Sequence, residues 1–190
     1  MLDGGLIAAR RSALLSLWWD SAVEAFPGET RSFLAREKDR FQNPVGATLR
    51  SGLMAILDAL LTDADDAELE RAAQAIVKVR AVQGVPAGEA LAFVFGLKKA
   101  ARAALGEQAE TAGGRRELEA LENAVDRLAL LAFTSYVGCR ERIFAIRSRE
   151  LQRRTASLLR QTAGVDLSDP GADDLPDSDP DCAFEGGSTA

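Results

Sequence analysis

Residues 115–162 read RRELEALENAVDRLALLAFTSYVGCRERIFAIRSRELQRRTASLLRQT, a stretch with no proline and a single glycine, Gly138. Small and apolar residues recur in it at alternating steps of three and four, the spacing that places them on one face of an α-helix. The repeat comprises Leu118, Leu121, Val125, Leu128, Ala132, Ser135 and Cys139, and its register shifts at Ile143 and Ile146. The sequence therefore predicts one long C-terminal helix.

A helix over this stretch would measure about 70 Å at 1.5 Å per residue, longer than a single small domain needs. We expect its C-terminal half to project or to pack on another subunit. The alternative is a kink near Gly138 that folds the end back.

Working outward, the same spacing predicts further helices over about 4–26, 30–40, 44–61, 69–83 and 90–106. Helix-breaking segments separate them: Pro27-Gly28, the polar run 62–66, Gly84-Val85-Pro86 and a loop at 111–114. Asn43 can cap the helix whose first turn holds Pro44. The predicted fold class is all-α, a single-domain bundle of about six helices with a long C-terminal helix.

The net charge of −6 is unevenly distributed, since residues 166–190 hold eight acidic and no basic residues. Residues 1–165 then carry a net charge of +2, which indicates neither a basic nucleic-acid binder nor an acidic solvating protein. We expect a helical domain over 1–164 and a disordered acidic tail over 165–190, because that tail has too little apolar surface to bury.

The chain has no histidine and no phosphate-binding glycine loop, which argues against imidazole-based catalysis and most zinc hydrolase sites. Glu117, Glu119 and Glu122 are expected to be solvated partners of arginines on their own helix. Cys139 and Cys182 form no metal or disulfide motif; Cys139 suits a small core position, and an exposed Cys182 could be oxidised reversibly. We expect no catalytic residue, cofactor or metal, and a carboxylate-based lyase or transferase is the least favoured alternative.

No signal peptide or transmembrane run is visible, so the expected location is the cytoplasm. Residues 140–160 contain seven arginines, at 140, 142, 147, 149, 153, 154 and 160. Three interpretations stay open: a solvated face screened by the acidic tail, a surface for a partner protein, or a patch for nucleic acid or membrane.

Three stretches mix charges with apolar positions: 39–46, 77–83 continuing to 93–98, and 126–142. The residues we single out from them as partner or signal-coupling candidates are Asn43, Pro44, Arg80, Asp126, Arg127, Tyr136, Arg140 and Glu141. We expect a polar network that ties helices together, with direct ligand contact as the alternative role.

Phe-Gln-Asn-Pro-Val-Gly at 41–46, Val-Arg-Ala-Val-Gln at 79–83 with the 93–98 continuation, and the 126–150 segment resemble the N-terminal domain of RsbRD-type proteins. Asn43-Pro44-Val45-Gly46 and Tyr-x-x-Cys-Arg-Glu at 136–141 are the most specific parts. This resemblance, over roughly residues 10–160, implies a helical sensory or protein-interaction module of bacterial stressosome signalling, without an established cofactor. Those co-antagonists carry a C-terminal STAS domain, whereas no strand pattern follows Leu159 here.

The predicted function is therefore a non-catalytic regulatory domain that binds proteins and self-associates as a dimer. A shift in helix packing would change what its last helix exposes. The alternative is a cytoplasmic accessory subunit that docks on a larger complex, such as a membrane-bound redox complex, through its arginine-rich end. No nucleic-acid partner is expected.

Overall fold

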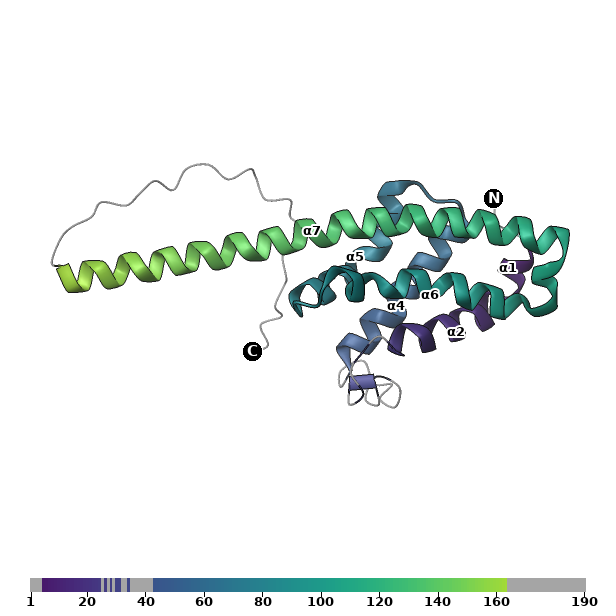
Figure 1. The fold of residues 1–190 in the computed structure, drawn as a ribbon, viewed down its shortest axis with the longest axis horizontal. Helices are drawn as coiled ribbons and strands as arrows, with labels where there is room; N and C mark the ends of the chain where they lie inside the picture. Colours follow the sequence, from purple (N-terminus) through teal and green to yellow (C-terminus); the bar gives the residue numbers. More distant parts are fainter. Residues whose placement is uncertain are drawn as a thin grey trace, which may run out of the picture. The chain divides into compact units, whose positions relative to one another are not determined.

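The computed structural model describes residues 5–24, 26, 28, 30–31, 34 and 43–163. The regular elements among them are helices: α1 Leu6–Ala9, α2 Arg11–Glu24, α4 Pro44–Leu61, α5 Asp66–Val82, α6 Ala87–Leu105, the 3-10 turn η1 Gly106–Glu110, and α7 Ala112–Ala163 (Figure 1). The predicted all-α class with a long C-terminal helix is confirmed. The helix expected over 30–40 and the tail over 165–190 fall largely or wholly outside the described residues.

Local signals at the helix starts explain several boundaries. Asn43 caps α4 by accepting a hydrogen bond from the Gly46 N–H at 2.8 Å, with Pro44 in the first turn. Asp65 caps α5 in the same way through the Glu68 N–H, also at 2.8 Å. These side chains satisfy amide donors that the first turn of a helix leaves without a helical partner.

Two boundaries differ from the sequence prediction. The helix expected over 4–26 is split at Arg10, whose N–H makes a tight turn to the Ile7 carbonyl at 3.0 Å. The loop expected over 111–114 is instead the start of α7, because the Thr111 hydroxyl accepts the Gly114 N–H at 3.0 Å. A Cβ at Gly114 would lie 2.0 Å from the Gln108 carbonyl oxygen, so this tight entry requires glycine.

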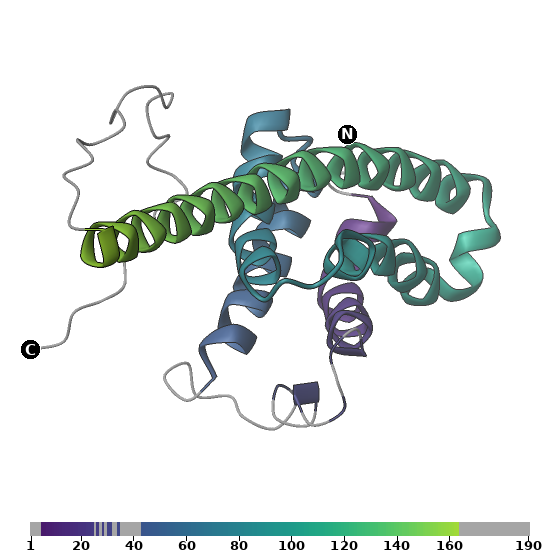
Figure 2. The same ribbon diagram turned by 60° about the vertical axis from the view of Figure 1, so that its left-hand side comes forward.

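The core is built from two close helix pairs, α2 with α6 and α4 with α5; Figures 1 and 2 show α4 and α5 as neighbours. Small residues allow the close approach: Gly52 of α4 lies against Ile76 of α5, and Gly96 of α6 lies against Ser21 of α2. The Trp18 indole is fully buried and donates to the Phe93 carbonyl at 2.6 Å, which joins α2 to α6.

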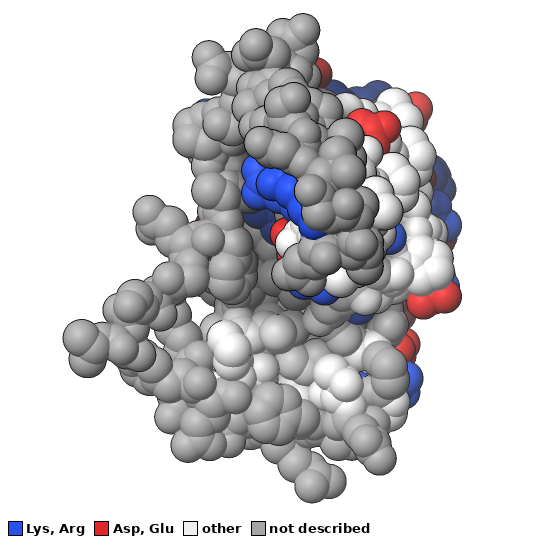
Figure 3. Space-filling view, turned by 90° about the vertical axis from the view of Figure 1, so that its left-hand side faces the viewer, with Lys and Arg blue, Asp and Glu red and all other residues white. Residues whose placement is uncertain are grey.

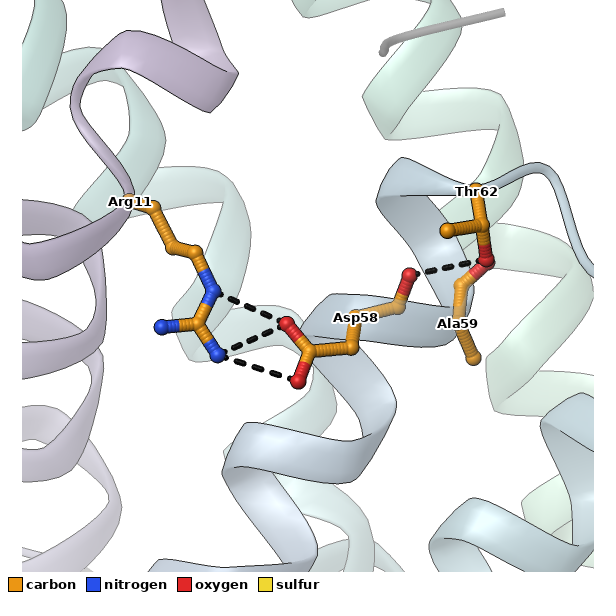
Figure 4. A network of polar contacts seen from close by, with 4 residues as sticks. All are labelled: Arg11, Asp58, Ala59 and Thr62. Carbon is orange, nitrogen blue, oxygen red and sulfur yellow. Dashed lines mark hydrogen bonds and ion pairs between the residues drawn. The ribbon is translucent and has the colours of Figure 1, made fainter.

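On the surface, a forked ion pair also joins α2 to α4. Arg11 donates to both carboxylate oxygens of Asp58, at 2.8 and 3.0 Å (Figure 4). The Thr62 hydroxyl ends α4 by donating to the Asp58 and Ala59 carbonyls. Both charged partners are well exposed, so the pair contributes little to stability.

Helix α4 is long and apolar enough to cross a membrane by length and composition, but half of that stretch is buried inside the bundle. This burial is typical of the core helix of a bundle.

The chain divides into two compact units, residues 1–138 and 139–190, and α7 runs unbroken through Gly138 from one to the other. In the first unit, α7 buries Leu118, Leu121, Val125, Leu128, Ala132 and Tyr136. After Ala132 the buried face of α7 therefore continues with Tyr136, and not with Ser135 as the spacing predicted. In the second unit, no residue of 139–160 is buried, and Cys139 is half-buried.

Candidate functional site

The most buried charged side chain among the described residues is Arg80, in the last turn of α5, with 5% exposed. Its guanidinium donates to the Gln83 side-chain oxygen at 3.4 Å and to the Glu89 backbone carbonyl at 3.3 Å. It also lies over the Phe26 ring, 4.4 Å from the centroid. Arg80 therefore joins the end of α5 to the first turn of α6.

Burial lowers the pKa of the Arg80 guanidinium from its usual value, while the nearby Glu89 and Tyr136 act in the opposite direction. An arginine keeps its charge at neutral pH even so. The site is thus a buried positive charge held by neutral oxygens and one aromatic face.

Two small cavities lie beside Arg80. One is lined by Val45, Thr48 and Val79, and the other by Ala22, Glu89, Ala90 and Phe93; Phe26, Leu49, Ile76 and Arg80 line both. Each has about 10 Å³ of space, close to what a single water requires. In this conformation the described residues around Arg80 leave room for solvent and not for an organic ligand.

Helix α7 reaches the same α5–α6 turn through Tyr136, whose hydroxyl donates to the Val85 carbonyl. One residue earlier, the Ser135 hydroxyl donates to the Glu70 carboxylate of α5 at 2.5 Å. Arg80 and Tyr136, two of the candidates from the sequence, are therefore brought to one turn from two helices.

The adjacent candidates Asp126 and Arg127 lie elsewhere on α7. Asp126 pairs with Lys98 of α6 at 2.6 Å. Arg127 donates to the Ala64 carbonyl at 2.9 Å and pairs with Asp66 at 3.3 Å, at the start of α5. Together with Tyr136, Arg127 connects α7 to the turns at both ends of α5.

Asn43 and Pro44 lie at the start of α4, and Asn43 is 3% exposed. The Asn43 side chain caps the helix through the Gly46 N–H, and Pro44 occupies the first turn. The structure thus gives these two candidates a part in beginning α4.

Arg140 and Glu141 belong to the second unit, where Arg140 is half-buried and Glu141 exposed. Arg142, Arg149, Arg153 and Arg160 are other arginines of the same stretch of α7. Arg154 pairs with Glu150 one turn earlier at 2.7 Å. Figure 3 shows basic side chains (blue) gathered near the centre of the face that it presents.

Glu117 and Glu122 were expected to pair with arginines on their own helix. Both carboxylates instead bond to residues of other helices. Glu117 accepts the backbone N–H groups of Leu6 and Ile7 at 2.9 and 3.0 Å, and so holds the start of α1. Glu122 pairs with Arg102 of α6 at 2.5 Å. The interpretation as partners within one helix was wrong for both, because the spacing of charges on one helix does not show which neighbour faces it.

Sequence reasoning missed the partners of this network: Gln83, Glu70, Ser135, Asp66 and Lys98. Glu70, Ser135, Asp66 and Lys98 carry no local motif, since each acts through a contact with another helix, whereas Gln83 lies only three residues after Arg80. Among the described residues, no group of three or more Cys, Asp or Glu side chains is placed to hold a metal.

Comparison with known families shows a match to the RsbT co-antagonist protein rsbRD N-terminal domain, over residues 13–151. No curated protein and no solved structure matches the chain.

Proposed function

The chain belongs to the family of RsbT co-antagonist RsbRD N-terminal domains, and from this premise we propose that it is a non-catalytic regulatory module of bacterial stress signalling. It acts in the cytoplasm by binding other proteins, without a cofactor and without nucleic acid. It comprises one helical domain over residues 1–164, followed by an acidic tail.

The observation that carries this proposal is the surface of α7 in the second unit. Three large apolar side chains there lie at intervals of seven residues, and so on one side of the helix: Phe144, Leu151 and Leu158, which are 72%, 64% and 61% exposed. Exposed apolar surface of this extent on one helix is typical of a protein-interaction site. We propose that α7 presents this surface to protein partners, including a second copy of the chain.

The network around Arg80 and Tyr136 supplies a route for a signal. A ligand or partner that moves the α5–α6 turn would disturb the contacts of Gln83, Val85 and Glu89 with Arg80 and Tyr136. Because Tyr136 belongs to α7, a second arrangement of this turn would change which side chains of α7 are exposed. Such a switch requires a signal that binds one arrangement more tightly than the other.

The test uses the full chain with a purified RsbT-type switch kinase and STAS-domain antagonist from the same organism. We expect a stoichiometric complex, measured by isothermal titration, that changes the kinase activity without any chemical change to the chain. The matched variants are Phe144→Ser with Leu151→Ser, which should weaken binding, and Leu17→Ser, exposed on α2, which should not. The proposal fails if neither protein binds, or if both variants bind like the original chain.

The arginines of α7 favour a second candidate, an accessory subunit that docks on a larger, membrane-bound complex. It predicts co-purification with that complex that is lost above about 0.5 M salt, where surface charges are screened. Changing Arg142, Arg149, Arg153 and Arg160 to Gln should abolish it. Retention of the complex by that variant argues against this candidate.

A further inference from the structure

Four exposed arginines lie in one line along α7 in the second unit. Arg142, Arg149, Arg153 and Arg160 follow one another at steps of seven, four and seven residues. At 3.6 residues per turn, these steps keep all four within about 20° of the same side of the helix. We call these four residues the arginine row.

The arginine row lies on the side of α7 away from the exposed apolar side chains. Phe144, Leu151 and Leu158 are about 160–180° from it around a straight helix. Those three carry the protein-binding role proposed above, so an occupant of the arginine row leaves that surface accessible. The inference that follows therefore goes beyond the proposed function and can fail independently of it.

The charge of the row is not neutralised from its own stretch of helix. Glu150 is the one acidic residue in the sequence from Arg142 to Arg160, and it pairs with Arg154, outside the row, at 2.7 Å. Arg149 and Arg153 are four residues apart, so their like charges repel each other. Four positive charges spread over about 27 Å of helix attract an elongated anion rather than a compact one.

We propose that the acidic segment 166–181 of the same chain covers the arginine row. This segment lies outside the described residues, and its sequence contains seven aspartates and no basic residue. Its aspartates are spread along its whole length, as the arginines are along theirs. Three prolines in it, at 170, 176 and 180, oppose a helix and favour an extended backbone that can follow the row.

The segment is also long enough to reach every arginine of the row. Helix α7 ends at Ala163, and Arg142 lies about 32 Å further back along the helix. An extended chain covers that distance in about ten residues. Residues 164–181 exceed this length, which leaves chain for the reversal of direction.

The covalent link gives the segment an advantage over separate anions. Its effective concentration at the row is about 1 mM, typical of a binding segment on a short linker. A partner that docks through the same arginines must therefore displace the segment first. The acidic tail thus acts as a competitor built into the chain.

The first test locates the segment in the full chain by nuclear magnetic resonance. A nitroxide label is attached to the native Cys182, one residue after the segment, in a chain with Cys139→Ser. We expect the label to attenuate the amide signals of residues 142–160 at about 20 mM salt. The signals should recover at about 1 M salt, where charges more than about 3 Å apart are screened.

A matched pair of variants shows whether the arginine row is responsible. Arg149→Gln with Arg153→Gln removes two charges from the row, and Arg147→Gln with Arg154→Gln removes two from another side of the same helix. We expect the first variant to lose at least half of the attenuation and the second to keep it. Circular dichroism verifies that both remain helical.

The second test measures competition. The probe is a fluorescent synthetic peptide with the sequence of residues 166–181, added to the full chain. A full-length variant with Asp173, Asp174, Asp177 and Asp179 changed to Asn has a weakened competitor. For a peptide Kd of about 0.1 mM and an effective concentration of about 1 mM, this variant should bind the peptide about 10-fold more tightly than the native chain.

Unattenuated signals in the native chain, or equal attenuation in the two arginine variants, would overturn the proposal. Equal peptide binding by the native chain and the asparagine variant would do the same. Attenuation found only when the label and the isotope are on different copies would place the segment on a second chain and refute the contact within one chain. Vesicles of anionic lipid, or a DNA duplex, that bind the native chain as tightly as the asparagine variant would show that the tail does not occupy the row.

Discussion

Replacing Tyr136 by Phe removes one hydroxyl and nothing else from the contact between α7 and the α5–α6 turn. The ring is 5% exposed and stays buried as Phe, so no cavity forms. The substitution removes the hydrogen bond to the Val85 carbonyl, whose oxygen then loses this donor and needs a water molecule in its place. An unsatisfied group of this kind costs about 1–2 kcal/mol in the free energy of unfolding.

The assay is urea unfolding followed by circular dichroism at 222 nm. Because the substitution leaves the buried area unchanged, we expect the slope of free energy against urea to stay constant. At a typical slope of about 2 kcal/mol per molar urea, the midpoint should fall by about 0.5–1 M. Hydrogen exchange at the amides of residues 83–85 should accelerate, since opening of the turn no longer breaks this bond.

The control is Thr134→Val, which removes an exposed hydroxyl bonded within α7 to the Leu130 carbonyl. It should shift the midpoint by less than about 0.2 M, as surface substitutions usually do. If Tyr136→Phe behaves like this control, the contact does not hold α7 to the turn, and the route proposed for the signal is wrong.

Thermal unfolding tests three other contacts. Gly114→Ala should destabilise the chain by at least about 2 kcal/mol, because its Cβ would lie 2.0 Å from a backbone oxygen, whereas Gly113→Ala has room and should be neutral or stabilising. Asp65→Ala should lose about 1 kcal/mol through the missing cap of α5, and Asp65→Asn should recover most of it in the same melts. Arg80→Met should stay within about 1 kcal/mol of the original stability, since it keeps the volume and removes a buried charge, while Arg80→Ala should lose about 2–4 kcal/mol; a large loss with Met would show that the guanidinium contacts themselves hold the fold.

Helix starts with a local cap were predictable from the sequence. The predicted helix 44–61 is observed as Pro44–Leu61, because Asn43 and Pro44 specify its start by side-chain chemistry within one turn. Gly113 and Gly114 led to the prediction of a loop, since glycine occurs in loops and in tight helix entries alike. Only the position of the Gln108 carbonyl distinguishes the two.

The candidate site was predictable residue by residue but not as an arrangement. Arg80 and Tyr136 stand out because each is polar within an apolar face. Their acceptors could not be inferred, since the Val85 and Glu89 carbonyls are backbone atoms without a side-chain signature. Arg127 likewise reaches a carbonyl 63 residues away, a distance that no local pattern spans.

The bonds from Glu117 to the amides of Leu6 and Ile7 join positions 111 and 110 residues apart. During translation, at about 5–20 residues per second, that carboxylate emerges several seconds after the segment it secures. Ile7 is only 1% exposed in the folded chain. Throughout this interval the site in which its side chain packs is still incomplete. The beginning of the chain is therefore among the last parts to settle, and a chaperone that recognises nascent apolar segments would find it there.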